Sequence, residues 1–411
     1  MTAKPILDGI LVVDFTQFFA GPVVTQLMAE LGAEVVKVEI APTGDQGRLL
    51  PFMKNGRSGY FIQQNTGKKS LCLDLKSDRG KAIVRDLIAK ADVMVENFTP
   101  GVIAKFGFDW ETVHALNPRL IMCSVSALGQ TGPLATTPGF DFTGQAYAGV
   151  SAMIGDPDGP PAMIGLAVGD AGAGMTGFAS INAALYHRER TGEGQYLESS
   201  LLDYLFRAHE ANIEAYSLSG GAIDPHRGGA HHRVYAPIGY YRAKDGYVVL
   251  IVTEGQWPSL CKAMGREDMI ADPRFANNDA RVANLEVLIE TIEAWTMSFP
   301  GKDELVRVLT EAHVPVAPVL SVAEAVAHPH LIARETVRDI VDPVAGPMKI
   351  AGSPLNFRNY PKHTSGPAPL LGEHNADLLG RHLGYDAAKI RELEEAGVLH
   401  AEPAAADRAA G

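Results

Sequence analysis

Short apolar runs alternate with amphipathic stretches along the first third of the chain. The run Ile10–Phe15 (ILVVDF) is typical of a buried strand, and the stretch from Pro22 to Leu31 is typical of a helix. Glu34–Glu39 (EVVKVE) alternates with a period of two and predicts a second strand. A helix is expected from Ser77 onward, and three more apolar segments predict strands at Leu71–Leu75, Val93–Glu96 and Leu120–Val125. Strands that alternate with helices predict a parallel sheet covered on both faces, which is a doubly wound α/β domain.

The stretch Gly165–Gly177 (GLAVGDAGAGMTG) supports two incompatible functions. The spacing of Gly172, Gly174 and Gly177 matches a dinucleotide-binding fingerprint, which would indicate an NAD-dependent oxidoreductase. Alternatively, Asp170 is a carboxylate nucleophile at the start of a glycine-rich helix, which would indicate a transferase with a covalent aspartyl intermediate. A Rossmann glycine turn should close the first strand of its sheet, whereas this stretch follows several strand–helix units. Its position therefore favours the aspartate.

The pattern changes after Asp170. Residues Ala171–Arg188 are rich in Gly, Ala and Ser, which is typical of a helix that packs closely against a neighbouring backbone. The glycines of Gly192–Gly194 are expected to end this helix, and Gln195–Ser199 predicts a strand. A long helix is expected from there to about Ser217.

A second, smaller domain is predicted farther along the chain. Ser217–Arg233 is a connector rich in Gly and His, and the runs Ile238–Arg242 and Tyr247–Val252 flank Lys244–Gly246, which predicts a β-hairpin. Helical segments around 255–264, 285–297 and 302–312 complete a smaller α+β domain. The predicted boundaries are a large domain at 1–216 completed by 343–400, a linker at 217–233, a small domain at 234–325, a return linker at 326–342 and a disordered tail at 401–411.

Composition narrows the classes of function. The 411 residues carry a formal net charge of −12 without a basic stripe, so nucleic acid is not an expected partner. Lys68 and Lys69 are expected in a solvated turn. Three well-separated cysteines, Cys72, Cys123 and Cys261, predict reduced thiols in the cytoplasm rather than a disulfide framework or a zinc site. No targeting segment or membrane-spanning run is recognised, so we expect a cytoplasmic protein with neither a membrane partner nor a bound metal.

Several motifs follow one another in a fixed order from the N-terminus nearly to the C-terminus. They are Asp14–Pro22 (DFTQFFAGP), Leu31–Glu39 (LGAEVVKVE), Asn65–Lys76 (NTGKKSLCLDLK), Ala91–Gly101 (ADVMVENFTPG), Gly129–Pro133 (GQTGP), Ala184–Arg188 (ALYHR) with Thr191–Gln195 (TGEGQ), and Pro369–His374 (PLLGEH). Together they resemble the family III CoA-transferases, which include formyl-CoA:oxalate and crotonobetainyl-CoA:carnitine CoA-transferases. The ordered set makes this resemblance much more specific than any single motif.

The resemblance places the family's nucleophile on Asp170. It implies an acyl-CoA:carboxylate CoA-transferase that works through an aspartyl anhydride and an aspartyl-CoA thioester. An acyl-CoA and a small carboxylic acid are the implied partners, the CoA thioester is a co-substrate, and no tightly bound cofactor is expected. If Asp170 were only a helix cap, the alternative would be an acyl-CoA-binding module without catalysis.

The resemblance also implies a CoA site and an assembly. Thr99 is expected to cap a helix that has Pro100 at its first position, so that backbone amides favour phosphate, and Lys105 would add positive charge. The implied CoA-binding residues are Phe19, Ala20, Leu73, Lys76, Asn97, Phe98, Thr99 and Lys105. Two chains of the family interlock like links, so we expect an interlocked homodimer.

Some positions depart from better-known members of the family. Ile40 stands where the formyl-CoA enzymes have a basic residue, and Ser126 and Pro138 replace lysines of active-site loops. These differences weaken a formyl or oxalate assignment more than a CoA-transferase assignment. The α-methylacyl-CoA racemases share the fold, but their histidine base corresponds to Phe140, which cannot move a proton. Racemisation is therefore disfavoured.

Overall fold

Six strands form one sheet in which every neighbouring pair is parallel. The computed structural model describes residues 4–360 and 366–403. The strands lie in the order β5 (Lys69–Leu73), β2 (Glu34–Ile40), β1 (Leu11–Asp14), β6 (Val93–Glu96), β7 (Ile121–Ser126) and β8 (Gln195–Ser200). The chain builds outward from β1 to β5, returns to place β6 beside β1, and then builds outward in the other direction. This is a doubly wound order, so the predicted parallel sheet is confirmed.

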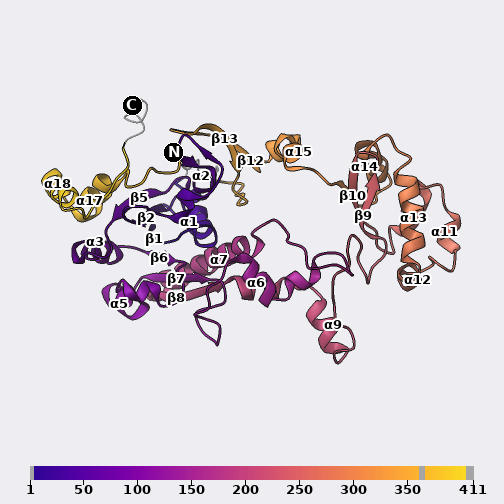
Figure 1. Cartoon of the computed structure of the whole chain (residues 1–411), viewed down its shortest axis with the longest axis horizontal. Coiled ribbons are helices and arrows are strands. Elements are labelled where there is room, and N and C mark those ends of the chain that lie inside the picture. Colours follow the sequence, from indigo (N-terminus) through magenta and orange to yellow (C-terminus); the bar gives the residue numbers. More distant parts are fainter. Residues whose placement is uncertain (1–3, 361–365, 404–411) are drawn as a thin grey trace. The chain divides into compact units, whose positions relative to one another are not determined.

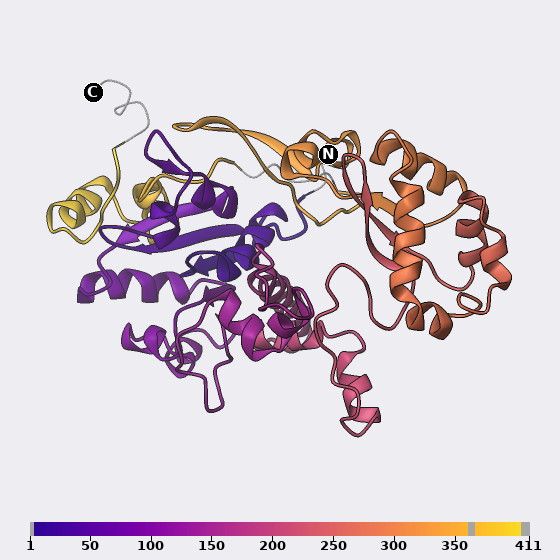
Figure 2. The same cartoon turned by 45° about the vertical axis from the view of Figure 1, so that its right-hand side comes forward.

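Helices cover both faces of this sheet (Figures 1 and 2). Because successive strand residues point to opposite faces, Val12 and Val35 belong to one core whereas Val13 and Val36 belong to the other. The first core is covered by α1 (Ala20–Glu30), α7 (Val168–Thr191) and α8 (Leu201–Arg207). The second is covered by α3 (Asp78–Ile88), α5 (Trp110–Leu116), α17 (Asn375–Leu383) and α18 (Ala387–Glu395).

The C-terminal segment returns to the unit that contains the sheet. This unit comprises Met1–Val150, Gly165–Glu210 and Pro329–Gly411. Arg57 forms a buried ion pair with Asp342 at 2.8 Å, and the backbone of Leu73 bridges to Leu399. The unit's other elements are β3 (Met53–Lys54), β4 (Arg57–Ser58), α2 (Gly59–Asn65), α4 (Val102–Lys105), α6 (Asp141–Tyr147), α16 (Pro329–Ala333), β12 (Val337–Asp342), β13 (Gly346–Ala351) and the 3-10 turn Gln46–Leu49. A further 3-10 turn, Val150–Met153, begins at the last residue of the unit's first segment.

A second unit comprises Ser151–Ile164 and Ala211–His328. Its sheet is antiparallel and contains β9 (Ile238–Ala243), β10 (Gly246–Ile251) and β11 (Val316–Pro318), so the predicted hairpin is confirmed. Its helices are α9 (Asn212–Leu218), α10 (Trp257–Ala263), α11 (Asp268–Ala271), α12 (Asn278–Ala283), α13 (Leu285–Thr296), α14 (Lys302–Glu311) and α15 (Val322–Ala327). The domain boundaries given above stay a prediction.

Two predicted helices differ from the structure. The helix expected from Thr99 begins only at Val102, because Gly101, in the left-handed conformation at φ 86°, takes the N-cap position. The long helix expected to about Ser217 is broken after Arg207, and α9 begins anew at Asn212. Of the predicted tail, residues 404–411 lie outside the described residues. In the described part of the chain, no helix is both long and apolar enough to cross a bilayer.

Helix α7 packs closely against α1, as its small residues predicted. A Cβ atom at Gly174 would lie 2.7 Å from Cβ of Val23 and 2.8 Å from the carbonyl oxygen of Ala20. A Cβ atom at Gly177 would lie 3.1 Å from Cγ2 of Val24. The glycines therefore allow the N-terminal half of α7 to pack in direct contact with α1.

We expect Gly174→Ala to destabilise the protein. Overpacking against the Ala20 carbonyl should cost about 2–3 kcal/mol, which outweighs the roughly 1 kcal/mol that alanine gains over glycine within a helix. Urea unfolding should show a net loss of about 1–2 kcal/mol, the difference of these two effects. Met175→Ala, at the adjacent exposed position, is the control and should change stability little. Equal stability of the two variants would contradict the close packing.

Candidate functional site

The carboxyl ends of β1 and β6 lie side by side at the centre of the parallel sheet. Between these strands the chain reverses its direction of building, and ligands of such sheets bind at this crevice. The side chain of Asn97 joins the two following loops, because its Oδ1 accepts from Gln17 N–H at 2.7 Å and its amide donates to the Gln17 carbonyl at 2.8 Å. A cavity of about 260 Å³ opens here, lined by residues 17–20, 97–100, 125–128, 135 and 137–140 together with Asp170 and Leu201.

Asp170 lies in the first turn of α7 and lines this cavity. It is the third helical residue, and the N-cap position belongs to Ala167, so Asp170 is not the cap of its helix. Burial, followed by the nearby negative charge of Asp141, raises the pKa of Asp170 to about 7. Among the described residues that line the cavity, none carries a positive charge. The carboxyl group is thus poised between its acid and its nucleophilic form near neutral pH.

Asp141, which the sequence analysis did not single out, holds the backbone at Asp170. Its Oδ2 accepts from Asp170 N–H at 2.8 Å, and its Oδ1 accepts from the side-chain amide of Gln145. The side chain is buried at the first position of α6, directly after Phe140. An acidic residue at a helix start was the available signal, but its proximity to Asp170 depends on two helices meeting.

Buried charges fix the loop that follows β1. Lys37 pairs with Asp45 at 2.8 Å and donates to the Thr16 carbonyl at 2.7 Å. Lys68 pairs with Asp14 at 3.1 Å and is only 2% exposed, so the prediction that it lies in a solvated turn is wrong. The sequence pattern could not predict that Lys68 is buried, because its partner is more than fifty residues away along the chain.

Aromatic side chains surround the start of α7. Phe18 has a left-handed backbone (φ 62°), held by a hydrogen bond from its N–H to Oδ1 of Asp45 at 3.2 Å. Its ring meets that of Phe140 edge-on at 6.0 Å, and the ring of Phe19 meets Tyr60 at 6.5 Å. Burial, followed by the negative charges of Asp170 and Asp45, raises the pKa of Tyr60, which keeps its phenol protonated near the carboxylate. Tyr60, which the sequence analysis did not single out, does not itself line the cavity and contacts the lining residue Phe19.

The eight residues implied for CoA binding fall into two groups. Five of them line the cavity: Phe19, Ala20, Asn97, Phe98 and Thr99. The other three do not line it. The Leu73 side chain is buried in the core, and Lys76 and Lys105 are exposed.

The glycines of the dinucleotide fingerprint do not form a phosphate-binding loop. Gly172, Gly174 and Gly177 all lie within α7, after the fifth strand of the sheet rather than the first. A Cβ atom at Gly172 would lie 1.8 Å from Cε1 of Tyr204, so this glycine makes room for a side chain. The NAD-binding alternative therefore loses its structural basis.

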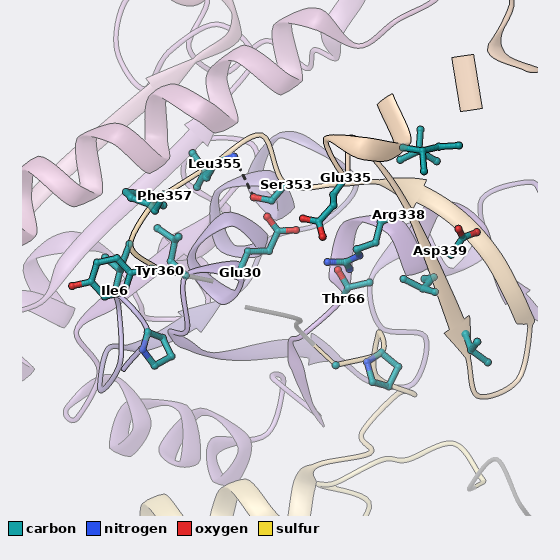
Figure 3. A pocket seen from close by; sticks show the side chains of 18 of the residues that line it. Ile6, Glu30, Thr66, Glu335, Arg338, Asp339, Ser353, Leu355, Phe357 and Tyr360 are labelled. Carbon is teal, nitrogen blue, oxygen red and sulfur yellow. Dashed lines mark hydrogen bonds between the residues drawn. The ribbon is translucent and has the colours of Figure 1, made fainter. Parts of the chain in front are cut away.

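A larger cavity of about 1000 Å³ lies in the same unit (Figure 3). Its walls include Glu30 and Leu31 at the C-terminal end of α1, whereas Ala20 at the other end lines the Asp170 cavity. An eleven-residue helix is roughly 16 Å long. None of the predicted site residues lines this larger cavity.

Comparisons with known proteins agree with the geometry. The family model described as CoA-transferase family III matches residues 7–375. The succinyl-CoA:mesaconate CoA-transferase of Haloarcula hispanica is 40% identical over 384 residues, which cover 91% of this chain and 95% of that protein. The formyl-CoA:oxalate CoA-transferase of Streptomyces avermitilis is 36% identical over 409 residues, which cover 96% and 99%.

A solved structure gives the same result. The CAIB/BAIF family protein from Brucella suis superposes with a TM-score of 0.82 at 34% identity, covering 92% of this chain and all of that one. Its similarity extends through both units and is not confined to the parallel sheet. The chain is an enzyme that transfers CoA, and it belongs to CoA-transferase family III.

Proposed function

We propose that this protein is an acyl-CoA:carboxylate CoA-transferase in which Asp170 is the covalent nucleophile. One observation carries the proposal: Asp170 projects into a cavity at the crevice between β1 and β6, with no cation among the described lining residues. A carboxylate that is neither well solvated nor paired is more reactive toward an electrophile than one held in an ion pair.

The reaction begins when an oxygen of Asp170 attacks the thioester carbonyl of the donor. The carbon–sulfur bond breaks, the CoA thiolate leaves, and a mixed anhydride joins Asp170 to the donor acyl group. The thiolate then attacks the aspartyl carbonyl, which forms an aspartyl-CoA thioester and releases the donor acid. The acceptor carboxylate attacks this thioester, the carbon–sulfur bond breaks, and the CoA thiolate leaves a new mixed anhydride between Asp170 and the acceptor. The thiolate then attacks the acceptor acyl carbonyl of this anhydride. The acceptor leaves as its CoA ester and Asp170 is regenerated.

Neighbouring residues prepare Asp170 for these steps. Asp141 orients the proposed nucleophile by accepting a hydrogen bond from Asp170 N–H, and the neutral phenol of Tyr60 interacts electrostatically with the Asp170 carboxylate. For the CoA moiety we propose the eight residues implied by the resemblance: Phe19, Ala20, Leu73, Lys76, Asn97, Phe98, Thr99 and Lys105. The CoA thioester is the co-substrate, and no other cofactor is required by this chemistry.

The names of relatives suggest which substrates to try first. They include succinyl-CoA:mesaconate, formyl-CoA:oxalate and succinate–glutarate CoA-transferases. We therefore propose a short dicarboxylic acid as one of the exchanging partners. A matrix of acyl-CoA donors and carboxylic acids, followed by mass spectrometry of the CoA esters, tests this directly.

We further propose that the active protein is an interlocked homodimer in the cytoplasm. Helix α9 exposes Ile213, Tyr216 and Leu218 and buries none of its residues, which suits a covered position in an assembly. The three cysteines of the protein are buried and form no disulfide, which suits a reducing compartment.

Asp170→Ala is expected to reduce exchange by at least a thousandfold while leaving the fold and CoA binding nearly unchanged, because one carboxylate performs every covalent step. Asp203→Ala is the matched control, since Asp203 is also the third residue of its helix but is exposed and outside the cavity. Steady-state exchange rates measure both. Turnover above a few per cent in the Asp170 variant would reject the mechanism.

Asp141→Asn should move the pH dependence. Because only ionised Asp170 attacks, kcat at saturating donor should rise with pH through about 7 in the wild-type protein. Removing the neighbouring negative charge lowers the pKa of Asp170, so this acid limb should shift to lower pH. Asparagine keeps an oxygen that can accept from Asp170 N–H. An unshifted limb in this variant, with normal folding, would show that Asp141 acts only through position.

The proposed homodimer should not dissociate on dilution to nanomolar concentration, because linked subunits cannot separate without unfolding. Mass photometry across a dilution series and denaturant unfolding followed by light scattering measure this. A folded monomer that binds CoA would reject the interlocked arrangement and leave the role of Asp170 untouched.

A further inference from the structure

Glu96 is a buried carboxyl group that the proposed chemistry does not use. It is the last residue of β6, is 2% exposed, and directly precedes the loop Asn97–Thr99 that lines the Asp170 cavity. The described groups that hydrogen-bond to it are the Ser124 hydroxyl and the Phe98 N–H, and neither is charged. A carboxyl group buried without a cation is costly to keep, which calls for an account of what it does.

The geometry ties Glu96 to the shape of this loop. Its Oε2 accepts from Phe98 N–H at 2.8 Å, which closes a tight turn over two residues. Ser124 lies directly beside Glu96 in the register of β6 and β7, and its hydroxyl also contacts Tyr196 of β8. A polar row therefore crosses three strands beneath the turn and anchors it to the sheet.

We propose that Glu96 is a positioning residue for the CoA thioester, acting through the Phe98 N–H on the turn Asn97–Thr99. The inference rests on the proposed function, because it takes this turn to be part of the CoA site. Glu96 itself does not touch substrate.

The protonation state of Glu96 gives the proposal a distinctive consequence. Burial raises the pKa of Glu96 to about 7, although its hydrogen bonds to Ser124 and Phe98 oppose the shift. Cys123 and Tyr196 interact electrostatically with Glu96, and both are neutral at this pH. Glu198 lies two strands away in the same register row and accepts from Gln130 N–H. Below pH 7 the acid is neutral, and above pH 7 it becomes an uncompensated negative charge under the turn. Because CoA is an anion, its affinity should fall as the pH rises through 7.

The test is calorimetric titration of CoA into the full-length wild-type protein and three variants at pH 6, 7 and 8.5. Glu96→Gln keeps an oxygen for Phe98 N–H but cannot ionise. The factor by which Kd rises between pH 6 and pH 8.5 should therefore be at least three times larger for the wild type than for this variant. Glu96→Met also cannot ionise and in addition lacks the acceptor, so its Kd should be about tenfold higher than that of Glu96→Gln at every pH. Val95→Ala, on the same strand but in the opposite core, is the matched control and should lower Tm without changing Kd.

The comparison with Glu96→Gln cancels the titrations that both proteins share, which are those of Asp170 in the cavity and of the phosphate groups of CoA, which ionise near pH 6. In exchange assays, Glu96→Met should raise KM for the acyl-CoA and leave kcat within about threefold, a split that lost stability alone does not produce. If Glu96→Met does not fold, Glu96→Gln decides alone.

The outcomes separate this inference from the proposed function. Wild-type binding and exchange, with both Glu96 variants indistinguishable from the wild type at all three pH values, would overturn only the role of Glu96. The expected pH pattern in a protein that binds CoA but exchanges no acyl group would support Glu96 and reject the transferase mechanism. A wild-type protein that binds no CoA would overturn both.

Discussion

Six charged side chains form three buried ion pairs around the loop between β1 and α1, and the rest of the site depends on them. Asp14 pairs with Lys68, Lys37 with Asp45, and Arg48 with Glu39. Buried pairs of this kind add little net stability, yet removing one partner typically costs about 3–5 kcal/mol because the other charge is left alone. Their value here is positional. Lysine ammonium groups hold the carbonyl oxygens of Thr16 and Pro22, so the loop between them has little freedom to move.

This fixed loop also helps to position Asp170. The loop leads into α1, and the glycines of α7 pack against α1. The position of the first turn of α7 therefore depends on the buried ion pairs that fix this loop. Asn97 links the same loop to the end of β6, which makes the two strand ends at the reversal of the sheet a single rigid edge. The strained backbone of Phe18 persists because Asp45 holds its N–H, and its ring then supports Phe140 at the start of α6.

The sequence predicts the parts that local pattern controls. Alternation in Glu34–Glu39 predicts a strand, and the small residues of Ala171–Arg188 predict a helix in close contact with a neighbour. From alternation the sequence does not predict that both faces of the strand are buried, which ion pairs of Lys37 and Glu39 allow. It does not predict Lys68, because a Gly-Lys-Lys-Ser turn looks solvated until Asp14 is brought beside it. It misplaces the helix after Thr99, because Gly101 adopts the left-handed conformation and takes the cap position from a locally favourable Thr-Pro pair. Asp141 is missed for the same reason as Lys68, since its partner lies 29 residues away.

Four of the buried carboxyl groups are of two kinds, according to whether a cation lies beside them. Burial works to raise the pKa of Asp14 and Glu39, but the cations beside them outweigh it and hold both values below the ordinary range. Asp170 and Glu96 are buried without such cations, and the pKa of each rises to about 7. The first kind is permanently ionised and serves to hold backbone. Asp170 lines the cavity, whereas Glu96 lies behind the turn that lines it. A carboxylate that has lost water and has no cation beside it stays reactive toward an electrophile, which suits the role proposed for Asp170. Cations beside Asp14 and Glu39, and none beside Asp170 and Glu96, therefore distinguish the carboxylates that hold backbone from those that titrate near neutral pH.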